Sequence, residues 1–301
     1  MLNKLKKQLQ FLYHKIIPVN VRYTLLYWRS LKVRQNRKLV LNYLQNKINQ
    51  KPNDNDMEIK GILEFVKHNK DIMIPYSFVK EYSYKNVVIY TDNGWKYVLY
   101  DNKRIYFPKT WPKIDIQLCY NNILCEQDRR SPHCYEEGSF RVQTSDIVAD
   151  VGAAEGFFAL SVIEKVEKVY LFECEKEWIE ALKKTFNPWQ EKIEIVNKYV
   201  SDSNNDTCLT LDDFFKDKEV NFIKADIEGA EIALLNGAKN ILAKQKNLKL
   251  ALCTYHREID AENIQEVLKK NNFYTEFSSG YMLCHMNDGK PLRKGIIRAA
   301  K

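Results

Sequence analysis

A glycine-bearing turn lies at residues 150–160, where the sequence reads DVGAAEGFFAL. An apolar strand-like segment ends at Asp150, and a segment of helical character begins after Gly156. Glycines such as Gly152 are needed where the backbone turns sharply and comes close to a ligand. The first turn of the helix offers N–H groups that have no partner within the helix. This combination predicts a nucleotide-type binding site.

Two cofactors compete for this turn. A dinucleotide fingerprint, G-x-G-x-x-G, would require small residues at Ala154 and Phe157. A phenylalanine at the third position would obstruct both helix–strand packing and the approach of a pyrophosphate. S-adenosylmethionine has no pyrophosphate and tolerates the looser G-x-x-x-G spacing. The turn therefore favours S-adenosylmethionine over NAD.

Glu173 ends the second apolar strand, about twenty residues after the turn, where an acidic residue can hydrogen-bond ribose hydroxyls. This position suits a nucleoside in either cofactor. The alternative is that Glu173 only caps the helix that follows.

A block of acidic residues, DIEGAE, follows the fourth apolar strand at 226–231. Asp226 and Glu228 are expected at the carboxyl end of that strand, where they could meet a substrate or the ammonium group of the cofactor. Glu231 falls in the first turn of the next helix and interacts favourably with the helix dipole. His256 ends the fifth strand, and its ordinary pKa of about 6.5 suits a general base for a hydroxyl proton. Asp226 is the candidate carboxylate that orients this ring.

A divalent metal ion is the alternative use of the same side chains. Asp226, Glu228 and His256 could present oxygen and nitrogen ligands to one ion. Three residues on two strand ends form a weak signature, so we expect no metal.

The elements that must position these residues alternate between strand and helix. Five near-continuous apolar segments lie at 146–152, 168–174, 192–201, 220–226 and 248–256. Helical segments lie at 157–165, 175–186, 230–245 and 260–271. This alternation predicts an α/β fold of Rossmann type, with a mostly parallel, doubly wound sheet between helices. Such sheets bind ligands at the carboxyl ends of their strands.

Composition excludes several classes of protein. The chain has 301 residues, 45% of them hydrophobic and 12% aromatic, which is neither disordered nor collagen-like. Its seven cysteines form no C-x-x-C pair, which argues against a disulfide framework and a thiolate zinc site. No apolar segment approaches the roughly 18 residues of a membrane span, and the N-terminus lacks a signal-peptide core. We expect a cytoplasmic protein, at most peripheral at the inner membrane face.

The positive charge is concentrated near the N-terminus. Residues 1–50 hold eleven Lys and Arg and no Asp or Glu, whereas the other 251 residues hold 36 basic and 39 acidic ones. Apolar residues recur at helical spacing at Leu2, Leu5, Leu9, Leu12 and Ile16. Residues 1–17 are therefore expected to form a basic amphipathic helix that lies on an anionic membrane, on the protein body or on a second subunit of a homo-oligomer. Contact with nucleic acid is the least favoured of these uses.

Short aromatic and β-branched segments separated by turn residues occupy 86–108 and predict a small antiparallel meander. Its aromatic rings could stack on bases or sugars, although such rings are more often core. We therefore expect three parts: a basic helical arm at 1–50, an accessory or substrate-recognition region at 51–140, and a cofactor-binding core at 141–301.

From about residue 122 to 299 the sequence resembles the FkbM-type methyltransferases. These are class I S-adenosylmethionine-dependent enzymes that mostly O-methylate sugars and natural products. The resemblance rests on EQDRRSPHCYE (126–136), DVGAAEGFFAL (150–160), YLFECE (170–175), TLDDFF (210–215), FIKADIEGAEIALLNGAKNIL (222–242) and TYHR (254–257). The D-x-E-G-A-E block is its most specific element, and residues 1–110 carry no such pattern.

The resemblance implies methyl transfer to a hydroxyl of a glycan, a glycolipid or a glycosylated intermediate. His256, Asp226 and Glu228 would be catalytic. S-adenosylmethionine would be held by Asp150, Gly152, Ala153, Glu155, Gly156, Phe157, Glu173, Cys174, Ser201, Asp202 and Asp226. The acceptor would be held by Glu126, His133, Tyr135 and Arg257.

Two other functions remain open at this level. An RNA methyltransferase would share the core and use the basic arm on phosphates. A non-catalytic Rossmann-fold binding protein would keep the fold without the chemistry. The second is less favoured, because the glycine turn, Glu173, the acidic block and His256 occur together.

Overall fold

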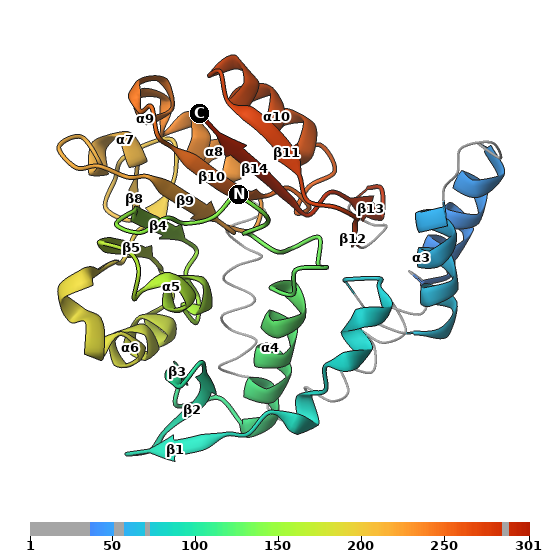
Figure 1. Cartoon of the computed structure of the whole chain (residues 1–301), viewed down its shortest axis with the longest axis horizontal. Helices are drawn as coiled ribbons and strands as arrows, with labels where there is room; N and C mark the ends of the chain where they lie inside the picture. The colour runs from blue at the N-terminus through green and yellow to red at the C-terminus, as the bar shows by residue number, and fades with distance from the viewer. Residues whose placement is uncertain (1–36, 51–56, 70–72, 285–288) are drawn as a thin grey trace. The chain divides into compact units, whose positions relative to one another are not determined.

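Buried strands with apolar residues on both faces form a seven-stranded sheet, in the order β11-β14-β10-β9-β4-β5-β6 (Figure 1). Its strands are β4 (Ile147–Val151), β5 (Lys168–Phe172), β6 (Ile193–Val196), β9 (Phe222–Ala225), β10 (Lys249–Cys253), β11 (Tyr274–Phe277) and β14 (Ile296–Ala300). The pairings among β4, β5, β6, β9 and β10 are parallel, and β14 runs antiparallel to both of its neighbours. The predicted Rossmann-like α/β fold with a mostly parallel sheet is confirmed.

This computed structural model describes residues 37–50, 57–69, 73–284 and 289–301. The chain divides into two compact units, one of residues 1–72 with 285–287 and one of residues 73–284 with 288–301. The expected accessory region at 51–140 is thus shared between the two units. The expected amphipathic helix at 1–17 lies outside the described residues, and its membrane contact stays a prediction.

In the first unit, a helix at 37–50 and α3 (Met57–His68) are described. The guanidinium group of Arg37 donates hydrogen bonds to the carbonyl oxygens of Val66, at 2.9 and 3.1 Å, and of Lys67. These bonds tie the start of one helix to the end of the other. No helix among the described residues is long and apolar enough to cross a membrane.

Helices cover both faces of the sheet in the second unit. They are α4 (Lys113–Glu126), α5 (Phe157–Val162), α6 (Lys176–Thr185), α7 (Leu211–Phe214), α8 (Glu231–Asn236), α9 (Lys239–Lys244) and α10 (Asp260–Lys270). Residues alternate along each strand between two apolar clusters, as side chains of a strand must. Val148 belongs to the cluster that includes residues of α4, α5 and α6, whereas Ala149 belongs to the cluster that includes residues of α7 to α10.

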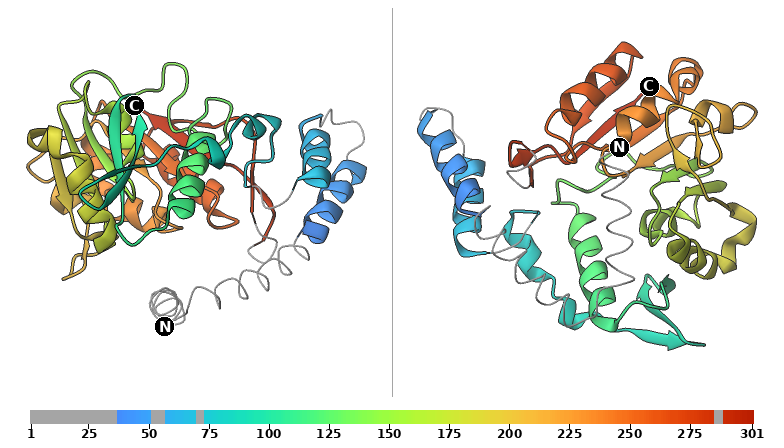
Figure 2. Two further views of the ribbon diagram at one scale, coloured as in Figure 1. Left: turned by 90° about the horizontal axis from the view of Figure 1, so that it is seen from below. Right: turned by 180° about the vertical axis from the view of Figure 1, so that it is seen from behind.

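The predicted meander is confirmed as a three-stranded antiparallel sheet of β1 (Tyr90–Asp92), β2 (Trp95–Tyr100) and β3 (Lys103–Phe107). Figure 2 shows this sheet in teal beside the green helix α4 from two further directions. The short elements are the 3-10 helices η1 (Ser77–Glu81), η2 (Tyr84–Asn86) and η3 (Asn187–Lys192) and the strand pairs β7 (Tyr199–Val200) with β8 (Cys208–Leu209) and β12 (Met282–Leu283) with β13 (Leu292–Arg293).

Two predicted elements are interrupted. The segment expected as one strand at 192–201 forms β6 and then β7, which pairs with β8 in a separate sheet. The helix expected at 230–245 is divided into α8 and α9 at Gly237. A Cβ atom at Gly237 would lie 2.1 Å from the carbonyl oxygen of Ser201, so the backbones are in direct contact there.

We predict that Gly156→Ala destabilises the protein more than Gly94→Ala. Both glycines have left-handed backbone angles, φ of 78° and 77°, which cost an L-residue about 1–2 kcal/mol. A Cβ atom at Gly156 would also lie 2.7 Å from side-chain atoms of Leu182 and Phe186, whereas Gly94 has open space around it. Urea denaturation should therefore show an extra loss of about 1–3 kcal/mol for Gly156→Ala. Equal losses would mean that the turn does not pack on α6 as described.

Candidate active site

The glycine turn between β4 and α5 is shaped by positive φ angles at Gly152 (74°), Ala154 (45°) and Gly156 (78°). A Cβ atom at Gly152 would lie 2.0 Å from the carbonyl oxygen of Asp226, the residue that follows β9. Glycine is thus required here because two backbones meet. The contact places the turn directly against the acidic block.

Glu173 connects this turn to the beginning of α6. One carboxylate oxygen accepts a hydrogen bond from the Ala154 N–H at 2.8 Å, and the other accepts from the N–H groups of Cys174 (2.7 Å) and Glu175 (2.8 Å). These three bonds occupy most of the roughly four acceptor positions of a carboxylate. The side chain therefore orders the turn and α6 and retains acceptor capacity for a ligand hydroxyl.

A lysine that the sequence analysis did not select, Lys224, lies in the middle of β9. Its ammonium nitrogen is 2.9 Å from a carboxylate oxygen of Asp150 and donates a hydrogen bond to the carbonyl oxygen of Gly152 at 2.8 Å. Burial raises the pKa of Asp150, whose side chain is fully inaccessible, and Lys224 partly offsets this. Burial would lower the pKa of Lys224, but Asp150 and Asp226 outweigh it and raise that pKa. A lysine inside the apolar segment VNFIKAD was the available signal.

Asp226 accepts contacts from three side chains at once. The Tyr135 hydroxyl donates to its Oδ2 at 3.2 Å, and Nε2 of His133 lies 3.5 Å from the same oxygen. Nε2 of His256 lies 3.3 Å from Oδ1. Burial alone would raise the pKa of Asp226, but the two histidines hold it well below its ordinary value. Its side chain is 23% exposed, so an anionic carboxylate at this strand end remains open to a ligand.

His256 lies between two carboxylates. Its Nε2 faces Asp226, and its Nδ1 lies 3.1 Å from Oε1 of the buried Glu231, which also accepts the Ile227 N–H at 3.0 Å. Burial lowers the pKa of His256, but Asp226 and Glu231 raise it to about 10. A carboxylate such as Asp226 is expected to raise the ordinary pKa of the ring, and Glu231 adds a second carboxylate that the sequence analysis did not place there. At neutral pH the resting histidine is a cation.

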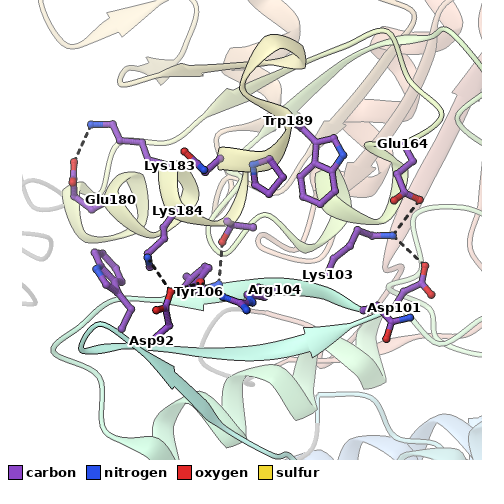
Figure 3. A pocket seen from close by; sticks show the side chains of 15 residues that line it. Asp92, Asp101, Lys103, Arg104, Tyr106, Glu164, Glu180, Lys183, Lys184 and Trp189 are labelled. Carbon is purple, nitrogen blue, oxygen red and sulfur yellow. Dashed lines mark hydrogen bonds and ion pairs between the residues drawn. The ribbon is translucent and has the colours of Figure 1, made fainter.

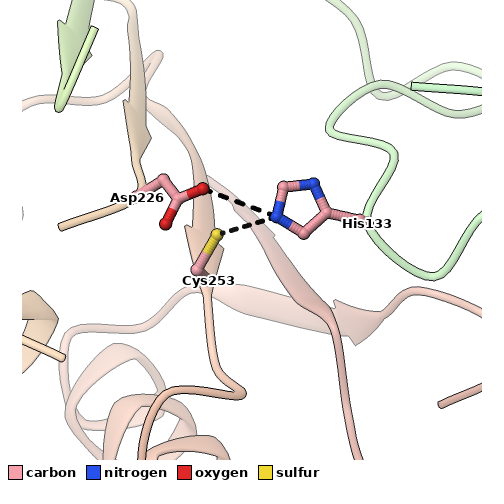
Figure 4. Close-up of side chains that lie close together, drawn as sticks. All are labelled: His133, Asp226 and Cys253. Atoms are coloured by element: carbon pink, nitrogen blue, oxygen red, sulfur yellow. Dashed lines mark hydrogen bonds and ion pairs between the residues drawn. The ribbon is translucent and has the colours of Figure 1, made fainter. Parts of the chain in front are cut away.

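His133 is brought into the site from the segment that precedes the core. It is buried, and its Nε2 lies 3.1 Å from the Tyr255 hydroxyl and 3.6 Å from Sγ of Cys253. Burial lowers the pKa of His133, but Glu126 and Asp226 raise it overall. Figure 4 shows the ring pointing at Asp226 and Cys253. The structure thus places this segment against the carboxyl ends of the strands.

Two further carboxylates belong to the same neighbourhood. Burial is the main cause that raises the pKa of Glu155, to about 7, and nearby Glu126 and Asp150 contribute. Burial also raises the pKa of Glu126, with a contribution from Asp226, whereas His133 lowers it. Glu126, Glu155 and Asp226 therefore form an acidic group around the carboxyl ends of β4 and β9.

The remaining expected cofactor residues lie in two places. Ala153 and Phe157 are buried, and the Phe157 ring packs against Tyr100 with 4.5 Å between ring centroids. The Ser201 N–H donates to the Leu209 carbonyl at 2.9 Å, and the Ser201 backbone packs on Gly237. The next residue, Asp202, is exposed. Cofactor contact by these residues stays a prediction.

Glu228 and Arg257 are exposed at the rim of the site. Glu228 adopts φ of 56° and has no hydrogen bond with another described residue. The carboxylate of the acidic block that contacts His256, besides Asp226, is that of Glu231. The backbone N–H of Arg257 donates to the Asp260 carboxylate at 2.9 Å. The Arg257 side chain is exposed. Substrate contact by Arg257 stays a prediction.

Two groups of described residues could each place three ligand atoms around a metal ion. They are His133 with Asp226 and Cys253, and Asp226 with Glu231 and His256. Glu231 thus replaces Glu228 in the metal alternative considered from the sequence. In both groups the imidazoles already pair with carboxylates, and the expected absence of a metal stays a prediction.

Comparison with known proteins identifies the domain that carries this site. Residues 191–274 match the family model described as the methyltransferase FkbM domain. This segment contains Lys224, the acidic block and His256. The match confirms the resemblance to FkbM-type methyltransferases seen in the sequence. No curated relative matches the chain.

Solved structures with similarity to this chain include methyltransferases. The methyltransferase FkbM of Methylobacillus flagellatus KT is 20% identical with a TM-score of 0.46, and the alignment covers 62% of this chain and 54% of that one. The chain thus spans about half the length of that protein. The precorrin-6y C5,15-methyltransferase of Geobacter metallireducens GS-15 is 11% identical (TM-score 0.37, 54% and 84% covered), and an rRNA methylase of Streptococcus thermophilus is 14% identical (TM-score 0.38, 53% and 89% covered).

We predict that His256 titrates near pH 10 in the ligand-free protein and that Glu231→Gln lowers this midpoint. The raised pKa means that the folded state holds this proton more tightly than the unfolded chain. The stabilisation is therefore complete below about pH 6.5 and is lost as the pH rises through about 10. NMR titration of the ring protons measures the midpoint. Glu228→Gln is the matched control and should leave it unchanged, and a midpoint near 6.5 in the unmodified protein would contradict the described geometry.

We also predict that Lys224→Met is strongly destabilising, by about 3–5 kcal/mol, because it leaves the Asp150 carboxylate buried without its partner. Changing both partners, Asp150→Asn with Lys224→Met, should recover most of this loss. Chemical denaturation of the three proteins gives the comparison. A double variant as unstable as the single one would show that the ion pair is not the reason for the loss.

Proposed function

We propose that this protein transfers a methyl group from S-adenosylmethionine to a hydroxyl group of a sugar. The observation that carries the proposal is the contact between the glycine turn and Asp226, whose carboxylate lies between His133 and His256. A turn of the kind that binds a nucleoside cofactor thereby adjoins groups that can bind a hydroxyl and accept its proton.

The residues around the turn have the chemistry that S-adenosylmethionine requires. Glu173 retains acceptor capacity for a ribose hydroxyl beside the turn. Asp226, whose pKa is held well below its ordinary value, supplies negative charge for the ammonium or sulfonium group. Burial raises the pKa values of Glu126 and Glu155, and a bound cation would favour their ionised forms. When bound, the cofactor supplies a methyl group on a cationic sulfur, which an oxygen nucleophile can attack.

His256 is the proposed general base. Its Nδ1 faces Glu231, which would hold the N–H of the neutral ring and direct Nε2 towards the acceptor. With a pKa of about 10 the ring is protonated at rest. Positive charge bound beside Asp226 would lower this pKa towards the working range, because like charges disfavour the imidazolium. Binding of the cofactor would thereby prepare the base.

The acceptor hydroxyl would lie near Asp226, within reach of His256 Nε2. His256 Nε2 would accept the hydroxyl proton when the acceptor oxygen takes the methyl group that the cofactor supplies, and S-adenosylhomocysteine would be the leaving product. Tyr135 and His133 fix the position of the Asp226 carboxylate through its other oxygen. Alignment of oxygen, methyl and sulfur would account for much of the acceleration.

A sugar acceptor follows from the resemblance to FkbM-type enzymes, most of which methylate sugars and natural products. The imidazole and carboxylate groups are also suited to a hydroxyl acceptor, which must lose a proton on methylation. A glycolipid or another lipid-linked glycan would give the basic segment at 1–17 a use at an anionic membrane surface.

Binding of S-adenosylhomocysteine to the purified full-length chain tests the cofactor. We predict micromolar affinity by calorimetry, a loss of at least about tenfold in Glu173→Gln, and no binding of NAD. One of the two Glu173 oxygens becomes an amide NH2 group in this variant, which cannot accept and therefore opposes either the Ala154 N–H or the N–H groups of Cys174 and Glu175, so the turn loses its order. Glu175→Gln, at the exposed neighbouring position, is the control and should bind normally.

Transfer of labelled methyl groups tests the acceptor class. Neutral oligosaccharides should receive label and RNA transcripts should not, and His256→Gln should reduce the rate by at least about a hundredfold. Binding of NAD in preference to S-adenosylhomocysteine would refute the cofactor assignment. Label in RNA alone would refute the sugar and favour the RNA methyltransferase.

A further inference from the structure

A pocket of about 880 Å³ lies away from the candidate active site. Its walls are the meander on one side and, on the other, the last turn of α6 with η3 (Figure 3). The wall from β3 carries Lys103, and Trp189 of η3 faces it across the opening. Nothing in the proposed methyl transfer uses this pocket.

Polar contacts at both ends of the pocket fix the two walls against each other. The Tyr106 N–H donates to the Thr185 hydroxyl at 3.0 Å, which ties β3 to the end of α6. The Lys184 ammonium lies 3.3 Å from the Asp92 carboxylate at one end of the pocket. Lys103, at the other end, pairs with Asp101 at 3.1 Å and Glu164 at 3.5 Å. The pocket is therefore built by the fold of the second unit.

The lining is charged but balanced. Its four basic residues are Lys103, Arg104, Lys183 and Lys184, and its four acidic residues are Asp92, Asp101, Glu164 and Glu180. All eight take part in ion pairs within the pocket. Besides the pairs already described, Lys183 pairs with Glu180 at 2.9 Å and Arg104 with Asp92 at 3.7 Å. A phosphate-rich ligand would need basic groups without such partners. The lining thus disfavours RNA or another polyanion.

Neutral groups supply the free hydrogen-bonding capacity. The side-chain amides of Asn102 and Asn187 and the indole N–H groups of Trp95 and Trp189 also line the pocket, and none has a hydrogen-bond partner among the described residues. Both tryptophans are partly exposed. Aromatic surface combined with amides and paired carboxylates matches a sugar ring, which has apolar C–H faces and a rim of hydroxyls.

From these observations we infer that the pocket binds a neutral oligosaccharide. Trp189 contributes an aromatic surface, Asn187 and Asn102 contribute amide groups, and the carboxylates of the ion pairs accept hydroxyl hydrogen bonds. A pocket with a volume of about 880 Å³ holds a few sugar units of a longer chain.

The pocket and the candidate active site lie at opposite ends of α6. The helix begins just after Glu173 and ends at Thr185 in the pocket wall. Ten residues of α-helix span about 15 Å, so a sugar in the pocket is not the one that receives the methyl group. The pocket would hold a remote part of a long acceptor. That role rests on the proposed function, whereas oligosaccharide binding itself does not.

Binding of defined neutral tetrasaccharides to the full-length protein tests the inference. Maltotetraose, cellotetraose, mannotetraose and chitotetraose are the probes, measured by ligand-observed NMR and calorimetry, with a heparin tetrasaccharide and a short single-stranded RNA as anionic arms. We expect at least one neutral probe to bind. Trp189→Ala and Asn187→Ala should each weaken it at least about fivefold, while affinity for S-adenosylhomocysteine is retained.

Matched substitutions separate a local effect from misfolding. Trp111→Ala removes another partly buried tryptophan outside the pocket, and Asn263→Ala removes an exposed amide on α10. Both should bind the sugar normally. The inference is overturned if no neutral probe binds, if the anionic probes bind more tightly, or if the pocket variants bind as well as their controls. Sugar binding without S-adenosylhomocysteine binding would support the pocket and refute the proposed function.

Discussion

Lys224 connects the parts of the protein that must meet for chemistry to occur. It extends from the middle of β9 to the Asp150 carboxylate in β4 and to the carbonyl oxygen of Gly152 in the glycine turn. A buried ammonium without such partners would be strongly unfavourable, so the lysine and the turn depend on each other. Two residues after the lysine, Asp226 sets its backbone against Gly152. Strand β9 thus fixes the glycine turn through Lys224 and is followed directly by Asp226, the carboxylate that most groups of the candidate active site contact.

Charge around Asp226 is arranged so that each group depends on its neighbours. The carboxylate stays ionised because two histidines face it, and His256 stays protonated because Asp226 and Glu231 face it. Such a network responds to any charged ligand, because one added cation changes the pKa of every member. In the proposed function, this is the physical reason why binding of a cationic cofactor would be coupled to activation of the base.

Sequence patterns predicted the layers of the fold better than the contacts of the site. The apolar segments and their alternation gave five strands of the sheet, whereas β11 and β14 at the C-terminal end were not predicted, since a short segment such as 296–300 gives little periodicity. The glycine turn, Glu173, Asp226 and His256 stood out because each follows a buried strand, although His256 lies three residues beyond the end of β10 and not at the end of a strand reaching 256 as predicted. Glu231 was assigned only to the helix dipole, because its contact with His256 joins residues far apart in the chain.

The sequence by itself determined that the chain folds as an α/β protein with polar residues at the carboxyl ends of parallel strands. Hydrophobic periodicity and turn residues are local properties, so they can be recognised in the sequence without knowing which residues are neighbours in space. Only the tertiary structure decided that His133 joins His256 on Asp226, that Lys224 partners Asp150, and that a balanced pocket lies at the far end of α6. These features depend on distances between segments up to about a hundred residues apart, which close packing sets and no local pattern records.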